Sequence, residues 1–387
     1  MHTQQKAAPL KNLHGEKRVA RTQPELNAVM AAHERYATFQ GGKRAQLKHA
    51  ELDGLNLANR NLSEADFAGT SFVGATLFGT NLSQASLYCA DLRGANLQSA
   101  NLTRADLRGC SLKGANLSFA MLDSADLRSA MMMYMGPNGV TIIDRNSARK
   151  DDDPNEDVKT ASGVDFSNCS LKNASFGSAK LDRANFSGAL LHGAKFKGAQ
   201  LTNALFKDAV LIGVNVQELG LSPSALEGCL TDITPEAHAK VPSLKAKLDA
   251  HQVWLATGGS KGALAVLDGE DLRPLKDAIA GRSLSGLSAR GVTAVGVNFS
   301  GCQMQAAKFD GADLRDADFT GADLRGASLK GVKLAHARLE KADLSALHLT
   351  GGRVLKADLT EAHATLLQFL GAVLDEKPTD LGLPIKS

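Results

Sequence analysis

Apolar residues recur at every fifth position along the first third of the chain. The series starts at Leu47, ends at Met132 and contains 18 apolar positions. A small residue, usually alanine, stands two positions before most of them, and Asp or Asn often lies between the two, as in Ala65-Asp66-Phe67. The repeating unit is therefore A-(D/N)-(L/F)-x-x. A spacing of five fits neither the 3.6-residue period of a helix nor the two-residue period of a flat strand.

A chain that turns a corner once in each unit explains this period. The small and the large residue of a unit are two apart on a short extended segment, so both point inward. The other three positions form the outer wall and the corners, where Gly, Ser and Asn tolerate turn geometry. Four units complete one square coil of about 20 residues, and stacked coils hydrogen-bond to each other at strand spacing. The pattern predicts a β-solenoid.

Two further tracts carry the same period. In residues 166–216 Phe and Leu alternate, so with four units per coil the phenylalanines are expected to stack on two opposite faces. We interpret these aromatic residues as core. The third tract, residues 284–374, keeps one unbroken register, although Ala289 and Ala294 hold the large-residue position at its start.

Residues 20 apart are predicted to lie above one another on neighbouring coils. Two columns of charged residues follow from this rule: Asp318, Arg338 and Asp358 in one, and Asp313, Lys333 and Arg353 in the other. Opposite charges paired across adjacent coils stabilise by about a few tenths of a kcal/mol each. We therefore assign these side chains to a solvated structural face rather than to an active site.

Each block of repeats follows an amphipathic helical pattern. The corresponding apolar-face residues are Leu26, Met30 and His33 in the first pattern, and Leu244, Leu248 and His251 in the second. A proline near each start and a Gly-Gly pair after each end are typical helix boundaries. An open solenoid end exposes apolar side chains and unpaired strand edges, so we expect each helix to cap the coil that follows it. The position of the two histidines favours packing over a ligand or switch role.

The unit A-(D/N)-(L/F)-x-x, found across roughly 290 of the 387 residues, resembles that of the pentapeptide-repeat family. The resemblance implies a right-handed quadrilateral β-helix. We expect a mainly β fold of two such solenoids, each preceded by a capping α-helical segment, produced by tandem duplication. The resemblance also implies two functional possibilities, because some family members bind DNA gyrase as mimics of duplex DNA and several dimerise through a solenoid end.

The pattern divides the chain into six parts. They are a flexible basic arm (1–21), an N-terminal capping helix (22–44), a first solenoid (45–216) with an inserted hairpin and loop (133–163), a helical linker and cap (217–262), a second solenoid (263–375) and a C-terminal tail (376–387). The arm lacks the apolar segment of a secretory signal. No stretch approaches the roughly 18 apolar residues that a membrane-spanning helix needs. We expect a cytoplasmic protein.

Composition excludes several classes of function. The 44 basic and 41 acidic residues give a net charge of +3, which indicates neither a strong nucleic-acid binder nor an acidic mimic of nucleic acid. Five isolated cysteines without a CxxC pair indicate neither a disulfide framework nor a zinc site. The acidic run at 151–157 lacks EF-hand spacing and reads as a solvated loop. We expect no catalytic site, no metal and no cofactor.

An apolar segment rich in methionine interrupts the repeats. The candidate partner-binding residues are Met131, Met132, Met133, Tyr134, Met135, Ile142 and Ile143. The Asn138-Gly139 turn between the two apolar runs predicts a β-hairpin. Methionine-rich surfaces adapt to different partners, so the hairpin is a candidate binding element. The alternative is a hairpin that folds passively against the side of the solenoid.

The C-terminal end of the repeats is more apolar than the repeat requires. Leu366, Leu370 and Val373 are candidate contacts of a cap or of a homodimer.

Three functions compete. The first is a non-enzymatic scaffold that presents a rigid surface to an unidentified protein partner. The second, gyrase binding by DNA mimicry, is disfavoured because residues 45–132 carry 7 basic and 8 acidic residues and residues 284–375 carry 10 of each. The third is contact of the basic arm with nucleic acid or a membrane surface, although such arms usually serve solubility.

Overall fold

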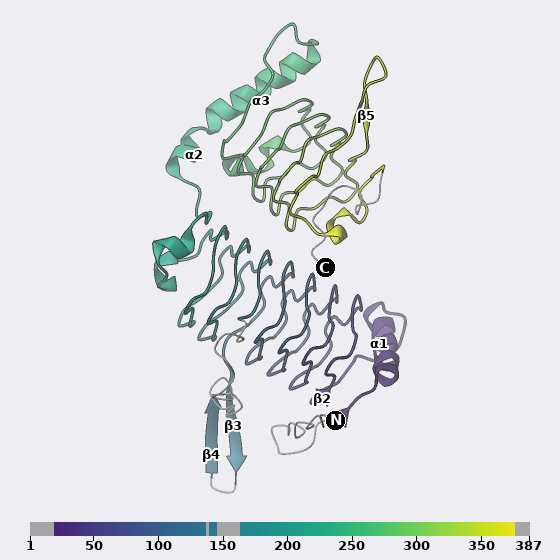
Figure 1. Ribbon diagram of the computed structural model, residues 1–387, viewed down its shortest axis with the longest axis vertical. Coiled ribbons are helices and arrows are strands. Elements are labelled where there is room, and N and C mark those ends of the chain that lie inside the picture. Colours follow the sequence, from purple (N-terminus) through teal and green to yellow (C-terminus); the bar gives the residue numbers. More distant parts are fainter. Residues whose placement is uncertain (1–18, 137–138, 145–162, 376–387) are drawn as a thin grey trace, which may run out of the picture. The chain divides into compact units, whose positions relative to one another are not determined.

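A computed structural model describes residues 19–136, 139–144 and 163–375 of the chain. The chain divides into two compact units, residues 1–232 and 233–387 (Figure 1). Most of the predicted basic arm, the acidic run at 151–157 and the C-terminal tail lie outside the described residues.

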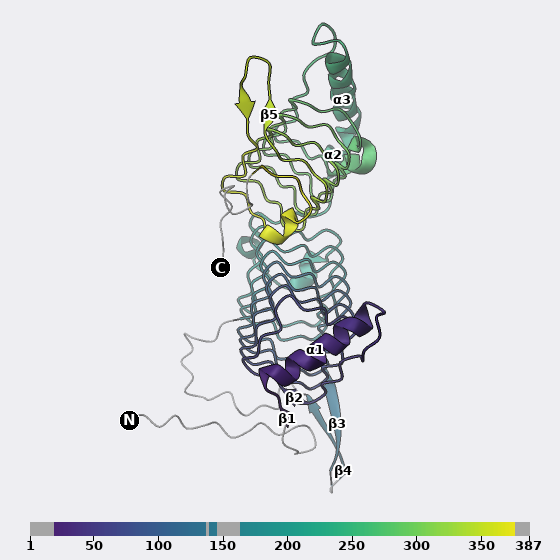
Figure 2. The ribbon, with the colours of Figure 1, turned by 90° about the vertical axis from the view of Figure 1, so that its right-hand side faces the viewer.

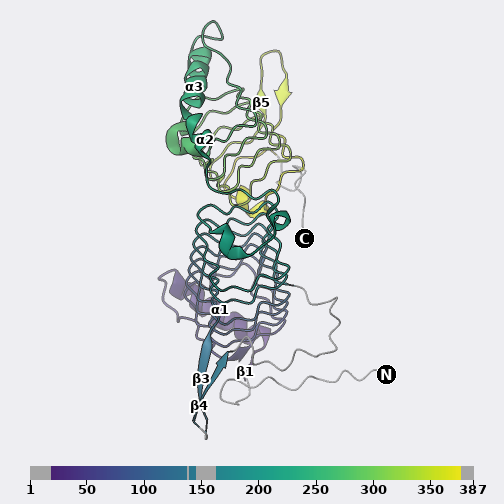
Figure 3. The same cartoon turned by 90° about the vertical axis from the view of Figure 1, so that its left-hand side faces the viewer.

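The first unit is built from stacked coils of four repeats. Parallel bridges join residues 20 apart, beginning with Gln46 to Asp66 and continuing coil after coil. The backbone N–H of Leu47 donates to the carbonyl of Asp66 at 2.8 Å, and the N–H of Asp66 donates back to the carbonyl of Ala45 at 3.0 Å. These bonds satisfy the backbone of a chain that has almost no long strand, and the coils are seen edge-on in Figures 1 and 3. The predicted β-solenoid with 20-residue coils is confirmed.

A tight turn makes each corner. The N–H of Ala50 donates to the carbonyl of Leu47 at 3.2 Å, and His49, the third residue of this turn, has a φ of 56°. The same position holds Gly54 in the next unit, with a φ of 69°. Left-handed backbone is easiest for glycine and tolerable for Asn. This requirement explains why these residues recur at the fifth position of the repeat.

The inward positions form one continuous core in each unit. In the first unit Phe166 stacks on Phe186 with ring centroids 5.0 Å apart, and Phe176 stacks on Phe196 at 4.7 Å. Rings on opposite faces meet edge to face, as Phe176 and Phe186 do at 5.6 Å. The predicted pair of phenylalanine stacks is confirmed. In the second unit Ala289 and Ala294 are fully buried at the large-residue position.

Helix α1, Gln23–Ala37, lies across the first coil of the first unit (Figure 2). The N–H of Thr22 donates to the carboxylate of Glu25 at 2.8 Å, which fixes the start of the helix. The helix buries Leu26, Met30 and His33 against the coil. Strand β1, Val19–Ala20, pairs in parallel with β2, Ala50–Glu51, so these two residues of the predicted arm belong to the fold.

The last coil of the first unit is irregular. After the final repeat the chain forms two short 3-10 helices, η1 at Val216–Leu219 and η2 at Pro223–Leu226. Parallel bridging nevertheless continues as far as Leu230, which pairs with Val210. Fourteen residues that do not show the repeat pattern therefore still complete the stack.

The second unit starts with two helices, α2 at Pro235–Ala239 and α3 at Val241–Ala256. Its first coil includes a third 3-10 helix, η3 at Arg273–Ile279, and spans 22 residues, as shown by the bridge from Val266 to Ser288. The bridge from Asp271 to Thr293 also spans 22 residues, and from Ser283 to Gln303 onward the bridges of the next coils join residues 20 apart. The final helix is η4, Leu366–Phe369.

The predicted unbroken register of the third tract is wrong. Ser328 pairs with Asp358, so this coil holds ten residues more than the others. The extra residues form a small antiparallel hairpin of β5, Leu347–His348, and β6, Val354–Leu355. Leu349, which the period placed in the core, donates its N–H to the carbonyl of Arg353 at 2.8 Å between these strands. Ten inserted residues are equal in length to two repeats, so the residues after them stay in phase with the five-residue period. The sequence pattern therefore does not reveal the insertion.

The insertion shortens both predicted columns of charged residues. Arg338 does pair with Asp318, at 2.6 Å, and Lys333 does lie beside Asp313. Asp358, however, stacks on Ser328 rather than on Arg338, and Arg353 belongs to the hairpin. Both columns therefore stop one coil earlier than predicted, because the inserted residues shift everything after them by half a coil.

The insertion in the first unit is a longer hairpin. Strand β3, Met131–Gly136, pairs antiparallel with β4, Gly139–Asp144, as expected from the Asn-Gly turn. The coil resumes afterwards, with Asp126 bridged to Ser175. Met132 pairs with Ile143 in this hairpin. Its assignment as the last residue of the first repeat series is therefore wrong, and the series ends at Leu127.

Candidate interaction surfaces

Cysteines recur inside the coils. Four cysteines occupy the small inward position, and each thiol donates to the carbonyl of a residue on the preceding coil: Cys110 to Leu87, Cys169 to Leu117, Cys229 to Phe206 and Cys302 to Ile279. Thr80 does the same with its hydroxyl, which donates to the carbonyl of Leu57 at 2.7 Å. Burial raises the pKa of the Cys169 thiol well above its usual value. These thiols are structural.

Where the second residue of a repeat is Asp or Asn, its side chain anchors the corner that follows it. The side-chain oxygen of Asn56 accepts the backbone N–H of Ala58 at 2.9 Å, and Asp or Asn does the same in many other repeats. Where the sequence reads Asp-Leu-Arg, the arginine also donates two hydrogen bonds to the carboxylate. The guanidinium of Arg108 donates to Asp106 from Nε at 2.8 Å and from a terminal nitrogen at 2.7 Å.

These forked pairs join residues only two positions apart, whereas the predicted charge pairs lie 20 positions apart. They recur at Asp91-Arg93, Asp106-Arg108, Asp126-Arg128, Asp271-Arg273, Asp313-Arg315 and Asp323-Arg325. The signal was the repeated tripeptide Asp-Leu-Arg, whose outer residues point the same way on an extended segment. Much of the charge of the outer walls is therefore neutralised locally.

The hairpin β3–β4 contains all seven candidate partner-binding residues. Its register pairs Met133 with Ile142 and Met135 with Val140. The two strands run side by side as a separate ribbon (Figures 1 and 3).

A shallow hollow of about 370 Å³ lies at the base of this hairpin. Its lining residues are Tyr88, Arg108, Arg128, Ser129, Ala130, Gly177 and Ser178. The guanidinium of Arg108 lies over the ring of Tyr88, 5.4 Å from its centroid. The hydrogen bonds that Arg108 donates to Asp106 raise the pKa of Arg108 above its usual value, so Arg108 stays protonated and paired with this carboxylate.

The second hairpin, β5–β6, is a surface that the sequence analysis did not find. Val354 and Leu355 on β6 are exposed apolar residues. The hairpin packs closely over Gly326, because a Cβ atom built there would lie 2.9 Å from the Cβ atoms of both Leu347 and Leu355.

The predicted C-terminal contacts lie at the surface of the second unit. Leu370 is 68 % exposed and Val373 is 53 % exposed, while Leu366 on η4 is also exposed. Their neighbour Phe369 is buried in the core. Val373 is bridged to Asp343, so the backbone of this apolar group is part of the last coil.

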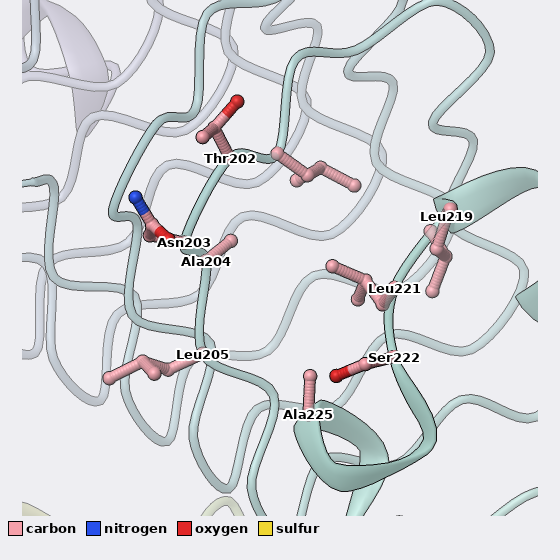
Figure 4. A pocket seen from close by; sticks show the side chains of 10 residues that line it. Thr202, Asn203, Ala204, Leu205, Leu219, Leu221, Ser222 and Ala225 are labelled. Atoms are coloured by element: carbon pink, nitrogen blue, oxygen red, sulfur yellow. The ribbon is translucent and has the colours of Figure 1, made fainter.

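A larger hollow of about 560 Å³ opens at the irregular end of the first unit (Figure 4). It lies between the regular coil at residues 201–205 and the chain that leads from η1 into η2. The side chains of Leu219 and Leu221 face Ala204 across it, with Ala225 on a third side (Figure 4). Thr202, Asn203 and Ser222 lie at its exposed edge. Apolar and polar side chains therefore both line the hollow, and exposed Leu205 also lies at its edge.

Neither a metal centre nor a membrane span is found in the part of the chain that the structure describes. No three His, Cys, Asp or Glu side chains gather there in a way that would hold a metal ion. Among the helices of residues 19–136, 139–144 and 163–375, each is too short or too polar to cross a bilayer.

Solved structures similar to this chain include pentapeptide-repeat proteins. HetL, from the cyanobacterium Nostoc sp. strain PCC 7120 and involved in regulation of heterocyst differentiation, is 20 % identical, with 92 % of this chain and 98 % of HetL covered and a TM-score of 0.23. QnrB1, a plasmid-mediated fluoroquinolone resistance protein, is 14 % identical, with 86 % and 97 % covered and a TM-score of 0.24. Rfr23 from Cyanothece 51142 is 16 % identical, with 47 % and 99 % covered and a TM-score of 0.23. No curated protein matched the chain.

Eight segments match the pentapeptide-repeat family. They are residues 43–77, 77–114, 100–133, 162–198, 189–218, 283–321, 298–334 and 327–363. Together they cover more than half of the 387 residues, and they coincide with the coils described above. The chain therefore belongs to the pentapeptide-repeat family.

Proposed function

We propose that this chain is a non-enzymatic scaffold that holds two hairpins on rigid solenoids and presents them to a protein partner in the cytoplasm. One observation carries the proposal. Both hairpins leave the coil and return to it without disturbing the stack, since Asp126 bridges Ser175 around the first and Ser328 bridges Asp358 around the second. Because the coils do not need these hairpins for their own hydrogen bonding, the hairpins can carry residues that bind a partner.

The proposal includes two four-sided, right-handed solenoids, each closed by the helix that precedes it. Buried contacts of α1 through Leu26 and Met30, and of α3 through Leu244 and Leu248, support this arrangement. Closed ends keep a solenoid from pairing edge to edge with other chains.

The outer walls support a binding role rather than catalysis. Their recurrent Asp and Asn side chains accept backbone N–H groups of the adjacent corner, and six of the Asp residues also hold an arginine. Groups engaged in this way stabilise turns and have little capacity left for acid–base chemistry. The same pairing argues against mimicry of DNA, which requires a continuous, uncompensated negative surface.

Deletions matched to the geometry test the proposal. Removing the 29 residues 131–159 brings Asp126 and Ser175 from 49 to 20 positions apart, and removing the ten residues 346–355 does the same for Ser328 and Asp358. Both variants are expected to keep the solenoid signal in circular dichroism. Affinity capture from the native cells should recover a protein with the intact chain and lose it with one deletion. Recovery of the same proteins by both folded deletions would refute the proposal.

A supercoiling assay with DNA gyrase separates the alternative function. The scaffold proposal expects no change in supercoiling when the protein is added. A concentration-dependent inhibition or protection of gyrase would favour the alternative.

We further propose that the apolar group Leu366, Leu370 and Val373 forms a contact between two copies of the chain. The exposure of these residues beside buried Phe369 supports this. Leu370→Asp should shift a dimer toward monomer in sedimentation, whereas a wild-type chain that stays monomeric at high concentration would contradict the contact.

A further inference from the structure

Phe39, just after helix α1, has an unfavourable position for a large apolar residue. Its backbone is left-handed, with a φ of 57°, and its side chain is 99 % exposed. A left-handed conformation costs a non-glycine residue about 1–2 kcal/mol. An exposed aromatic ring also contributes none of the free energy that burial of its apolar surface would give. The backbone N–H of Phe39 donates to the carbonyl of Tyr36 at 3.1 Å, a contact that does not need the ring.

The second unit shows which residue the local geometry prefers at this point. A threonine directly follows each of the helices α1 and α3. The hydroxyl of this residue, Thr38 or Thr257, donates to the carbonyl four residues earlier at 2.8 Å. The next residue is left-handed in both units, and in the second unit it is Gly258, with a φ of 59°. Glycine therefore suffices for the turn, and the turn does not require the ring of Phe39.

The other end of the first unit offers a receptor of suitable chemistry. The hollow between residues 201–205 and the η1–η2 segment is lined by Leu219, Leu221, Ala204 and Ala225, and it has a volume of about 560 Å³ (Figure 4). A single aromatic side chain can enter such a space and bury its ring against the leucines.

The charges around these two features are opposite. Residues 35–47, around Phe39, include three basic residues and no acidic one: Arg35, Lys43 and Arg44. Residues 208–232, around the hollow, include four acidic residues and no basic one: Asp208, Glu218, Glu227 and Asp232. Complementary charge of this kind steers association and selects the matching surface.

We propose that Phe39 of one copy of this chain docks into the hollow at residues 201–225 of a second copy. The two surfaces lie on different segments of the same unit, so the contact is heterologous: each copy uses its aromatic residue toward one neighbour and its hollow toward another. Such a contact either closes into a ring or continues as an open chain of copies.

Sedimentation velocity of the full chain over a wide concentration range is the first test. The wild-type chain is expected to form species larger than a dimer, and added salt is expected to reduce them because the opposed charges are screened. Phe39→Gly removes the ring and relieves the left-handed backbone, so it should keep or raise the melting temperature while abolishing these species. Ala225→Trp fills the hollow and should have the same effect on association.

Mixing the two variants gives the decisive result. Both variants carry Leu370→Asp in this test, which removes the other proposed contact. Phe39→Gly retains an intact hollow and Ala225→Trp retains an intact Phe39, so a mixture should form one-to-one dimers although each variant alone stays monomeric. Ser222→Trp, at the exposed edge of the hollow, replaces Ala225→Trp if that variant fails to fold. The proposal is overturned if wild-type chains do not associate beyond a dimer, if the variants associate as wild type does, or if the mixture stays monomeric.

Discussion

The imidazole of His33 joins helix α1 to the first coil through the backbone of Ala45. Its Nδ1 accepts the N–H of Ala45 at 2.9 Å, and its Nε2–H donates to the carbonyl of Ser63, also at 2.9 Å. In the second unit the Nδ1 of His251 accepts the N–H of Ala265 at 3.1 Å. Both alanines stand at the first inward position of their coil. Only a neutral imidazole can accept such a hydrogen bond.

Protonation of His33 should therefore weaken the attachment of α1. Burial lowers the pKa of His33, as does nearby Arg44, although the carbonyl of Ser63 and the carboxylates of Glu34 and Glu64 act in the opposite direction. The unfolded chain, in which the pKa of histidine is about 6.5, then binds the proton first. The stabilisation is complete above about pH 6.5 and is lost as the pH falls through the lowered pKa of the folded state.

Urea unfolding at about pH 7.5 and about pH 5.5 checks this expectation. The wild-type midpoint should be lower at the acidic pH. His33→Leu should cost about 1–3 kcal/mol at neutral pH, because it leaves the N–H of Ala45 without a partner. The variant should also lose part of the pH dependence, and an unchanged pH dependence would show that His33 is not the titrating group.

The Asp-Leu-Arg forks should stabilise mainly through the corner that they anchor. Asp323 accepts the backbone N–H of Arg325 at 3.2 Å and the guanidinium of the same residue at 2.9 Å and 2.6 Å. Asp323→Asn keeps an acceptor for the backbone, whereas Asp323→Ala removes it. Because partly exposed ion pairs contribute only about 0–1 kcal/mol, we expect the step from Asn to Ala to cost more than the step from Asp to Asn.

Unfolding measurements at low and high salt separate the two contributions. Only the step from Asp to Asn should depend on salt, because it alone removes a charge. Equal destabilisation by Asn and Ala would mean that the ion pair, not the corner, is the main contribution.

Gly326 reports on the packing of the β5–β6 hairpin. A Cβ atom there would lie 2.9 Å from Leu347 and Leu355, while the same atom at Gly321 would meet open space; both glycines have a φ near 60°, at 62° and 65°. The two alanine variants share the backbone penalty, so their difference isolates the clash. Gly326→Ala should be less stable than Gly321→Ala by about 1–3 kcal/mol in urea unfolding. Equal stability would indicate that the hairpin does not pack on the coil.

Phe186 tests the core of the first unit. It is fully buried between the stacked rings of Phe166 and Phe206. Phe186→Ala should cost about 3–5 kcal/mol, as other buried phenylalanines do. Phe39→Gly is the matched control, since it removes an exposed ring from the same unit, and it should cost nothing. A small effect of Phe186→Ala would contradict the continuous aromatic stack.

The five-residue period was enough to predict which side chains point inward. Each large residue and the small residue two positions before it share a face of the same extended segment, so local spacing alone decides their direction. The prediction held from Leu47 to Leu127, for the stacked phenylalanines and for the degenerate positions Ala289 and Ala294. The helices that precede the coils were also predictable, because their apolar residues and boundary signals are local.

The period could not decide which residues lie above one another. Asp358 stacks on Ser328 instead of Arg338 because of the ten inserted residues. They leave the five-residue phase unchanged, but each later residue lies two faces of the coil away from its predicted place. Met132 and Leu349 satisfy the period and yet lie in hairpins, since pairing with a neighbouring strand outweighed another turn of the coil.

What the sequence by itself determined is the direction of each side chain, in or out, because that depends on a few neighbouring residues. The tertiary structure alone decided the columns, the second hairpin and the hollow at the irregular end. These features depend on where the chain returns after a coil or an insertion, and that return is set by contacts between segments far apart in the sequence.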